Sequence, residues 1–338
     1  MYAMQSMPLV DLYRTMMRIR QFELTVERVS QGGVAAFGGL VQGDAHVRGP
    51  LHLSIGQEAV AAGVCAHMQD GDYVTSNHRG HGHTLAMGAS VERMMLEFFG
   101  KAGGYCGGKG GSMHIADFSH GMLGANGVVA AGLPIAVGAA HSIKRLGTAA
   151  VSVCFFGDGA INRGPFLESL NWAQVYRLPV LFVCEDNQWA ATTPTASTTA
   201  GAGVVARAQA LGLPAVSVDG NDVQAVYAAA QLAIQTMREG GLPSLLHART
   251  YRLRGHVSVD KAAYRDPQAV QQAQERDPLP RTRQTLLQLG TPAADLDAIE
   301  AQAQTACEAA VQQALQAPWP QASAAFTDVQ NVGAGQWH

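Results

Sequence analysis

The sequence predicts an α/β protein with a doubly wound, mostly parallel sheet flanked by helices. Short apolar runs rich in β-branched and aromatic residues alternate with helical segments in the second half of the chain, which is typical of a parallel sheet covered on both faces. Polar residues follow several of these runs, and sheets of this kind bind ligands at the carboxyl ends of their strands. The expected strands cover residues 151–156, 178–186, 215–220 and 243–251.

Helical periodicity accounts for much of the remaining chain. The first helix is expected where Leu9, Leu12, Met16, Ile19 and Phe22 recur at helical spacing. Two glycine-rich stretches, 31–50 and 100–114, are interpreted as loops, and the histidine-rich stretch at 76–83 as a polar turn. The expected helices cover residues 8–30, 56–68, 91–99, 160–176, 201–211, 222–238 and much of 267–320.

These elements suggest three parts. Residues 1–50 would hold an N-terminal helix and a glycine-rich loop, and residues 51–266 an α/β domain. Residues 267–338 would form a C-terminal helical tail that packs on the domain or on a partner.

Composition excludes several classes of protein. A net charge of −3 offers no basic patch for nucleic acid, and no apolar run approaches the roughly 20 residues that span a bilayer. The five cysteines are scattered and form no CxxC pair, which argues against a disulfide framework or a zinc site. The N-terminus has no signal-peptide pattern. We therefore expect a soluble protein of the cytoplasm.

The strongest chemical signal lies after two consecutive expected strands. Gly157-Asp158-Gly159 follows the first and Asn187 follows the second, 29 positions after Asp158. Mg²⁺ prefers oxygen ligands that it shares with phosphate and water, and a carboxylate and an amide oxygen at neighbouring strand ends could converge on one ion. A helix beginning near Ala160 would direct its N–H groups at a diphosphate. The alternative is a simple turn and an unrelated strand end.

The segment GDGAINRGPFLESLNWAQVYRLPVLFVCEDNQWA resembles the thiamine-diphosphate motif, and specifically that of alpha subunits of the decarboxylating component of 2-oxo-acid dehydrogenase complexes. HLSIGQEAVAAGV, GGKGGSMHIADFSHGMLGANGVV and TYRLRGH agree with this family. The similarity covers roughly residues 8–320 and is closest to acetoin dehydrogenase alpha subunits. It implies the thiamine-diphosphate-binding fold, with thiamine diphosphate and Mg²⁺ as cofactors.

The resemblance also assigns site residues. The implied Mg²⁺ ligands are Asp158, Asn187 and the backbone carbonyl of Trp189. The backbone N–H groups of Gly159 and Ala160 would meet the diphosphate, which Arg79 would grip. His78 stands where pyruvate-type relatives have tyrosine, and Gly127 and Val129 match the segment at the aminopyrimidine. His52 and His256 are the catalytic assignments, and His256 is also assigned to cofactor binding.

The histidines carry alternatives. His52 would line the substrate pocket, although a core histidine is the simpler interpretation of the sequence alone. His256 would lie near the diphosphate and the mouth of the site. His81 matches a recurrent family position, and His83 could lie either behind the site or at the surface. Arg163 departs from the family, which commonly has glutamine there.

The family resemblance implies a two-subunit enzyme that cleaves acetoin and passes the acetyl group to lipoamide; the alternative is a pyruvate or branched-chain 2-oxo-acid dehydrogenase. No glutamate of the chain matches the one that protonates the aminopyrimidine, so we expect a beta subunit to supply it in a heterotetramer of two alpha and two beta subunits. A lipoyl-bearing acyltransferase would be the further partner. A dinucleotide-binding oxidoreductase would need a GxGxxG that is not found at the expected place. A non-catalytic subunit would be expected to lack Asp158 or Asn187.

Overall fold

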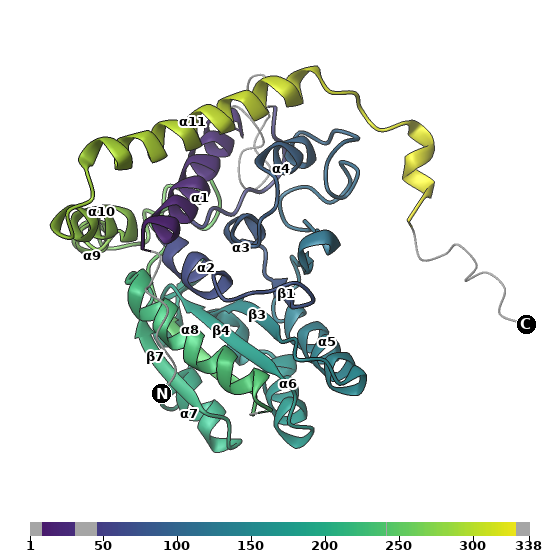
Figure 1. Ribbon diagram of the computed structural model, residues 1–338, viewed down its shortest axis with the longest axis vertical. Helices are drawn as coiled ribbons and strands as arrows, with labels where there is room; N and C mark the ends of the chain where they lie inside the picture. Colours follow the sequence, from purple (N-terminus) through teal and green to yellow (C-terminus); the bar gives the residue numbers. More distant parts are fainter. Residues whose placement is uncertain (1–8, 31–45, 241, 329–338) are drawn as a thin grey trace, which may run out of the picture.

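A computed structural model describes residues 9–30, 46–240 and 242–328, and it confirms the α/β class (Figure 1). Six strands form one sheet in the order β2-β1-β3-β4-β8-β7, and every neighbouring pair in it runs parallel. The strands are β1 (Tyr73–Ser76), β2 (Met122–Ala125), β3 (Ser152–Gly157), β4 (Val180–Asp186), β7 (Ala215–Asp219) and β8 (Ser244–Arg249). A separate antiparallel pair, β5 (Trp189–Ala190) and β6 (Thr193–Pro194), follows β4.

Both faces of the central strands β3 and β4 are buried, and successive side chains of a strand point to opposite faces. On β3, Cys154 and Phe156 pack into one apolar cluster, whereas Val153 and Phe155 pack into another. This double burial explains why the central strands are continuous apolar runs in the sequence. Helices α5 (Gly132–Leu146), α6 (Gly164–Val175) and α7 (Gly203–Ala210) share the first cluster, and α2 (Glu58–Cys65) and α8 (Val223–Arg238) share the second.

A helical layer lies beyond α2. Figure 1 shows α11 (Ala293–Gln316) crossing the top of the molecule beside α1 (Leu9–Ser30), with the sheet in the lower half. Apolar residues of α1, α4 (Val91–Phe98) and α11 form one core cluster, and α9 (Pro267–Gln274) and α10 (Pro278–Gln288) precede α11. The helical segments expected at 8–30 and over much of 267–320 are thus confirmed in the described residues. No helix in the described part of the chain combines the length and apolar character that a membrane crossing requires.

The structure differs from the sequence prediction in several elements. Strands β1 and β2 were not expected, because four residues are too few to display a clear alternation, and α5 was missed as well. The predicted turn at 76–83 includes the end of β1 and the start of α3 (His81–Ala86). The helix expected from Ala160 is a 3₁₀ turn (Asp158–Asn162) followed by α6 from Gly164. Residues 31–45 of the predicted loop at 31–50 lie outside the described residues.

The division into three parts stays a prediction. Helix α1 contributes Ile19 and Phe22 to a core that also holds Leu51 and Leu53 of the expected central domain. Cys307 of α11 belongs to the same cluster.

The packing of α1 gives a stability test. Phe22 is fully buried and meets the ring of Phe98 edge-on, with 5.3 Å between ring centroids. We expect Phe22→Ala to lower the free energy of unfolding by about 3–5 kcal/mol, through lost burial and an unfilled cavity. Urea unfolding of the purified chain measures the change. Phe118→Ala is the control, because Phe118 is 74% exposed; equal effects of the two substitutions would contradict this packing.

Candidate active site

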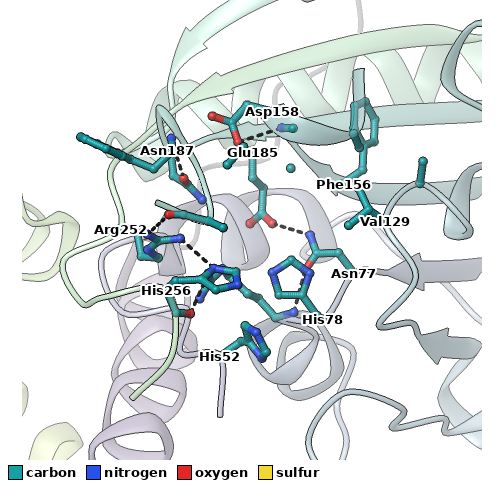
Figure 2. A pocket seen from close by; sticks show the side chains of 18 of the residues that line it. His52, Asn77, His78, Val129, Phe156, Asp158, Glu185, Asn187, Arg252 and His256 are labelled. Carbon is teal, nitrogen blue, oxygen red and sulfur yellow. Dashed lines mark hydrogen bonds between the residues drawn. The ribbon is translucent and has the colours of Figure 1, made fainter. Parts of the chain in front are cut away.

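A cavity of about 400 Å³ opens at the carboxyl-end edge of the sheet. The segments that follow β1, β2, β3, β4 and β8 all contribute to it, because the carboxyl ends of parallel strands share one edge. Figure 2 shows Asp158 on one side and the histidines grouped on the other. Every site residue predicted from the sequence lines this cavity: His52, His78, Arg79, Gly127, Val129, Asp158, Gly159, Ala160, Asn187, Trp189 and His256.

Asp158 is a buried carboxylate just after β3. Its Oδ1 accepts the backbone N–H of Gly159 at 3.1 Å, and its Oδ2 accepts the hydroxyl of Thr195. Burial raises the pKa of Asp158 to about 6, and the nearby carboxylate of Asp186 adds to this rise, although the Thr195 hydrogen bond opposes it. A cation beside Asp158 would therefore offset an unfavourable buried charge.

The loop after β4 holds Asn187 in one orientation. Its Nδ2 donates to Oε1 of Gln57 at 2.9 Å, and its Oδ1 accepts the N–H of Trp189 at 3.2 Å. The amide oxygen keeps a second lone pair for a cation. Gln188 and Ala191 in the same loop have positive φ angles of 70° and 53°, a costly conformation for residues other than glycine that often occurs at functional sites.

Glu185 is a buried acid of the cavity that the sequence analysis did not single out. Its carboxylate accepts from Asn77 at 3.4 Å and contacts Nε2 of His83 at 3.2 Å. Nδ1 of His83 lies 2.8 Å from the Ser76 hydroxyl, and His83 is 1% exposed. His83 therefore lies behind the site and not at the surface. The position of Glu185, one residue before Asp186-Asn187 at a strand end, was the available signal.

Two buried guanidiniums, those of Arg79 and Arg252, also line the cavity. Arg79 donates to the carbonyl oxygens of Leu53 at 2.9 Å and His256 at 3.0 Å. Arg252, which the sequence analysis also missed, donates to the carbonyl of Ala191 at 3.1 Å. Burial lowers the pKa of Arg79 to about 9 and that of Arg252 to about 10, and repulsion from a neighbouring arginine adds to each shift. Both remain cationic at neutral pH.

Three imidazoles form the floor beside these cations. The ring centroid of His52 lies 4.6 Å from that of His78 and 4.8 Å from that of His256. Burial lowers their pKa values to about 3 for His52, about 2 for His78 and about 4 for His256, and the charge of Arg79 lowers each further. All three are therefore neutral at pH 7. Nδ1 of His52 is buried without a hydrogen-bond partner among the described residues.

The tautomer of His256 follows from its neighbours. Its Nδ1 lies 3.1 Å from Nη2 of Arg79 and 3.4 Å from Nη1 of Arg252. A guanidinium can only donate, so Nδ1 accepts and the proton of the neutral ring lies on Nε2. Ring nitrogens of the three histidines lie within 4.8 Å of one another, but the two cations repel a metal ion and occupy Nδ1 of His256. We interpret the cluster as hydrogen-bonding groups.

The side of the cavity formed by Gly127 and Val129 is open. Val128 and Val129 are 63% and 45% exposed, and Ala130 has a positive φ of 74°. A side chain at Gly127 would come within 3.5 Å of the His114 ring. The His114 ring therefore lies directly beneath this segment, while Val128 and Val129 are left exposed by the described chain.

Oxygen donors that face buried guanidiniums across one cavity, at the carboxyl edge of a parallel sheet, are typical of an enzyme that binds a phosphorylated cofactor through a divalent cation. The sequence matches the dehydrogenase E1 component family over residues 41–323, and the chain belongs to this family. The family is one of oxidoreductases and implies thiamine diphosphate as cofactor.

Curated relatives agree with this membership. The chain is 45% identical to the alpha subunit of acetoin:2,6-dichlorophenolindophenol oxidoreductase of Bacillus subtilis, covering 94% of this chain and 92% of the relative. It is 44% identical to the protein of that name from Cupriavidus necator, over 95% and 93% of the two chains. The alpha subunit of the pyruvate dehydrogenase E1 component of Zymomonas mobilis is 37% identical, over 95% and 88%.

The neutral histidines give a pH prediction. The pKa of His78 is lower in the folded chain, about 2, than the value of about 6.5 for an unfolded chain, so the unfolded state binds the proton first on acidification. This group should leave the free energy of unfolding unchanged above about pH 6.5. At lower pH it should lower that free energy by at most about 1.4 kcal/mol per pH unit. Urea unfolding at several pH values should give a shallower dependence for His78→Phe than for the wild type. Parallel curves would refute the assignment.

Proposed function

We propose that the chain is the alpha subunit of a thiamine-diphosphate-dependent dehydrogenase that cleaves acetoin and transfers the acetyl group to lipoamide. The observation that carries the proposal is the cavity in which Asp158 and Asn187 face Arg79 and three neutral histidines. The acetoin-cleaving reaction is supported by the similarity to relatives named as acetoin oxidoreductase subunits.

The residues of the cavity fit the cofactor. Mg²⁺ would be held by Asp158, Asn187 and the carbonyl of Trp189, since these are the hard oxygen donors that it prefers. The diphosphate would lie against the N–H groups of Gly159 and Ala160, and Arg79 would neutralise it. A Cβ at Gly157 would meet no atom within 4 Å, so there is room beside the backbone for a ligand. When bound, thiamine diphosphate supplies a nucleophilic carbon that adds to a carbonyl and takes up the electron pair of the breaking C–C bond.

The histidines suit an uncharged substrate. His256 presents its Nε2–H as a fixed donor, whereas His52 and His78 can donate or accept according to tautomer. Acetoin carries a carbonyl and a hydroxyl on adjacent carbons, and neutral imidazoles can bind both oxygens. Cleavage removes the hydroxyl proton and releases the hydroxyl-bearing half of acetoin as acetaldehyde. The low pKa values of His52 and His78 keep both rings unprotonated at pH 7, so each can accept a hydrogen bond from this hydroxyl.

The partners follow from what the cavity lacks. Among the described residues, the acidic side chains that line it are Asp158 and Glu185, and both belong to the ends of β3 and β4. The carboxylate that activates the aminopyrimidine would come from a beta subunit that covers the open side at Val128 and Val129. We propose two alpha and two beta subunits, a lipoyl-bearing acyltransferase that receives the acetyl group, and a cytoplasmic location, in keeping with five free cysteines.

A pyruvate or branched-chain 2-oxo-acid substrate is the second candidate. The similarity to a pyruvate dehydrogenase subunit supports it, as does the presence of Arg79 and Arg252, which could attract a carboxylate. The relatives named as acetoin oxidoreductase subunits are more similar to the chain, however, at 45% and 44% identity against 37%. We therefore favour acetoin.

The metal assignment predicts the behaviour of Asp158→Asn. The complex of the chain with its beta-type partner is titrated with thiamine diphosphate and Mg²⁺, and turnover of acetoin, pyruvate and branched 2-oxo acids is followed with an artificial electron acceptor. We expect the wild type to require both cofactors and the variant to lose turnover by about 100-fold or more, because a charged ligand of the ion is removed. Asp70→Asn, at an exposed position, should remain active. Full activity of Asp158→Asn would disprove the site.

The substrate preference predicts the effect of His78→Tyr, which introduces the residue of pyruvate-type relatives. We expect kcat/KM for acetoin to fall by about tenfold, because an imidazole able to accept a proton is replaced by a phenol. The value for pyruvate should fall less or rise. Steady-state kinetics with both substrates measures the ratio; an unchanged ratio would show that His78 does not determine the preference.

A further inference from the structure

The glycine-rich loop at 100–114 is wound around one buried carboxylate. Glu97, near the end of α4, is 0% exposed, and none of the ion pairs among the described residues includes it. Backbone N–H groups surround it instead. Its Oε2 accepts from Cys106 at 2.8 Å and Gly108 at 2.9 Å, and its Oε1 accepts from Gly110 at 2.8 Å and Gly111 at 3.0 Å.

The glycines of the loop are required by this arrangement. A Cβ at Gly104 would lie 2.4 Å from Oε2 of Glu97 and 2.6 Å from its Cα. Gly108 has a φ of +77°, and a Cβ there would lie 2.5 Å from the backbone of Gly100. Tyr105 packs on the neighbouring apolar core, and its hydroxyl accepts the N–H of Ser90 at 2.7 Å. The segment from Cys106 to Gly111 is held by hydrogen bonds to a charged acceptor, which are stronger than bonds between neutral groups.

A second buried carboxylate fixes the far end of the loop. Glu23 of α1 accepts from Ser54 N–H at 2.8 Å and contacts Nδ1 of His81 at 2.9 Å, and Nε2 of His81 lies 2.9 Å from the Ser112 hydroxyl. Burial opposes ionisation of Glu23, but the charge of His81 and the hydrogen bonds from His81 and Ser54 hold its pKa below the ordinary value. The loop is therefore attached to α1 and α3 through Ser112.

The end of the loop forms part of the cavity. Met113 lines it, and the His114 ring lies where a Cβ at Gly127 would come within 3.5 Å. One residue later, the carbonyl of Ile115 accepts the N–H of Ala125 at 2.8 Å. The loop therefore supports the segment that leads from β2 to Gly127 and Val129.

We infer that Glu97 is a positioning residue for the cofactor: by ordering the loop at 100–114, its carboxylate places Met113 and His114 beneath the Gly127 wall of the cavity. Glu97 does not line the cavity itself. The inference rests on the proposed function, in which this wall meets the aminopyrimidine. On the outside of the loop, the ion pair of Lys109 with Asp328 lies at an exposed site, where ion pairs contribute little.

The test is Glu97→Gln in the complex with the beta-type partner. The amide keeps the size of the side chain but presents an N–H₂ group to backbone donors, so it cannot accept all four bonds. We expect amide hydrogen exchange in peptides covering 104–111 to accelerate by about tenfold or more. The KM for thiamine diphosphate should rise by about tenfold, while kcat at saturating cofactor stays within about twofold. Glu92→Gln, exposed on the same helix and bonded to Ser90, should match the wild type in both measurements.

The readouts separate a positioning role from a structural one. A loss of folded protein alone would lower total activity without changing the KM for thiamine diphosphate. Faster exchange with an unchanged KM, or slow exchange as in the wild type, would overturn the inference. Should Glu97→Gln not fold, Ser112→Ala breaks the milder anchor on the same loop and should raise this KM in the same direction. A wild-type complex without cofactor-dependent turnover would refute the proposed function, while exchange would still report on the loop.

Discussion

The parallel pairing of β3 with β4 is the constraint from which the site follows. The two strands remain in register from Ser152 opposite Val180 to Gly157 opposite Glu185, so the chain leaves the sheet at the same level in both. Asp158 and Asn187 therefore emerge as neighbours, although 29 positions separate them. Because the flanking strands also run parallel, the residues that follow them are delivered to the same edge. A shift of the register would separate the oxygen donors and remove the cavity's acidic side.

Buried charge is then the dominant energetic problem. Asp158 and Glu185 would be costly in a low-dielectric cavity, as would Arg79 and Arg252. Both signs line one cavity, and the three imidazoles beside the arginines stay neutral because burial and the charge of Arg79 both disfavour their protonation. The result is a site already arranged to take up an anionic group together with a cation, with uncharged donors beside them. Such an arrangement costs little reorganisation when ligands bind.

Prediction from the sequence succeeded where a residue and its function lie in one local pattern. The four longer strands carry apolar runs, and Asp158 and Asn187 follow two of them. The edge of the sheet that binds ligands and its oxygen donors could therefore be predicted from the sequence. The histidines and Arg79 came only from the family resemblance, because their partners lie far away in sequence: Arg79 reaches His256 across 177 positions. The four-residue strands β1 and β2 were too short to show a pattern. Glu97 was missed because its partners are backbone N–H groups. Such partners do not require particular side chains, so the sequence shows only the glycines around them.

The walls of the cavity differ in what holds them, and this difference indicates where a second chain belongs. The strand ends are fixed by the sheet, and the loop at 100–114 by two buried carboxylates. The segment at Val128 and Val129 has His114 and the pairing of Ile115 with Ala125 beneath it, and both valines are exposed in the described chain. A wall that is rigid on its inner side and apolar on its outer side can receive another protein surface without rearranging. Under the proposed function, the activating carboxylate needs no counterpart in this chain, because a beta subunit that covers Val128 and Val129 would also complete the site.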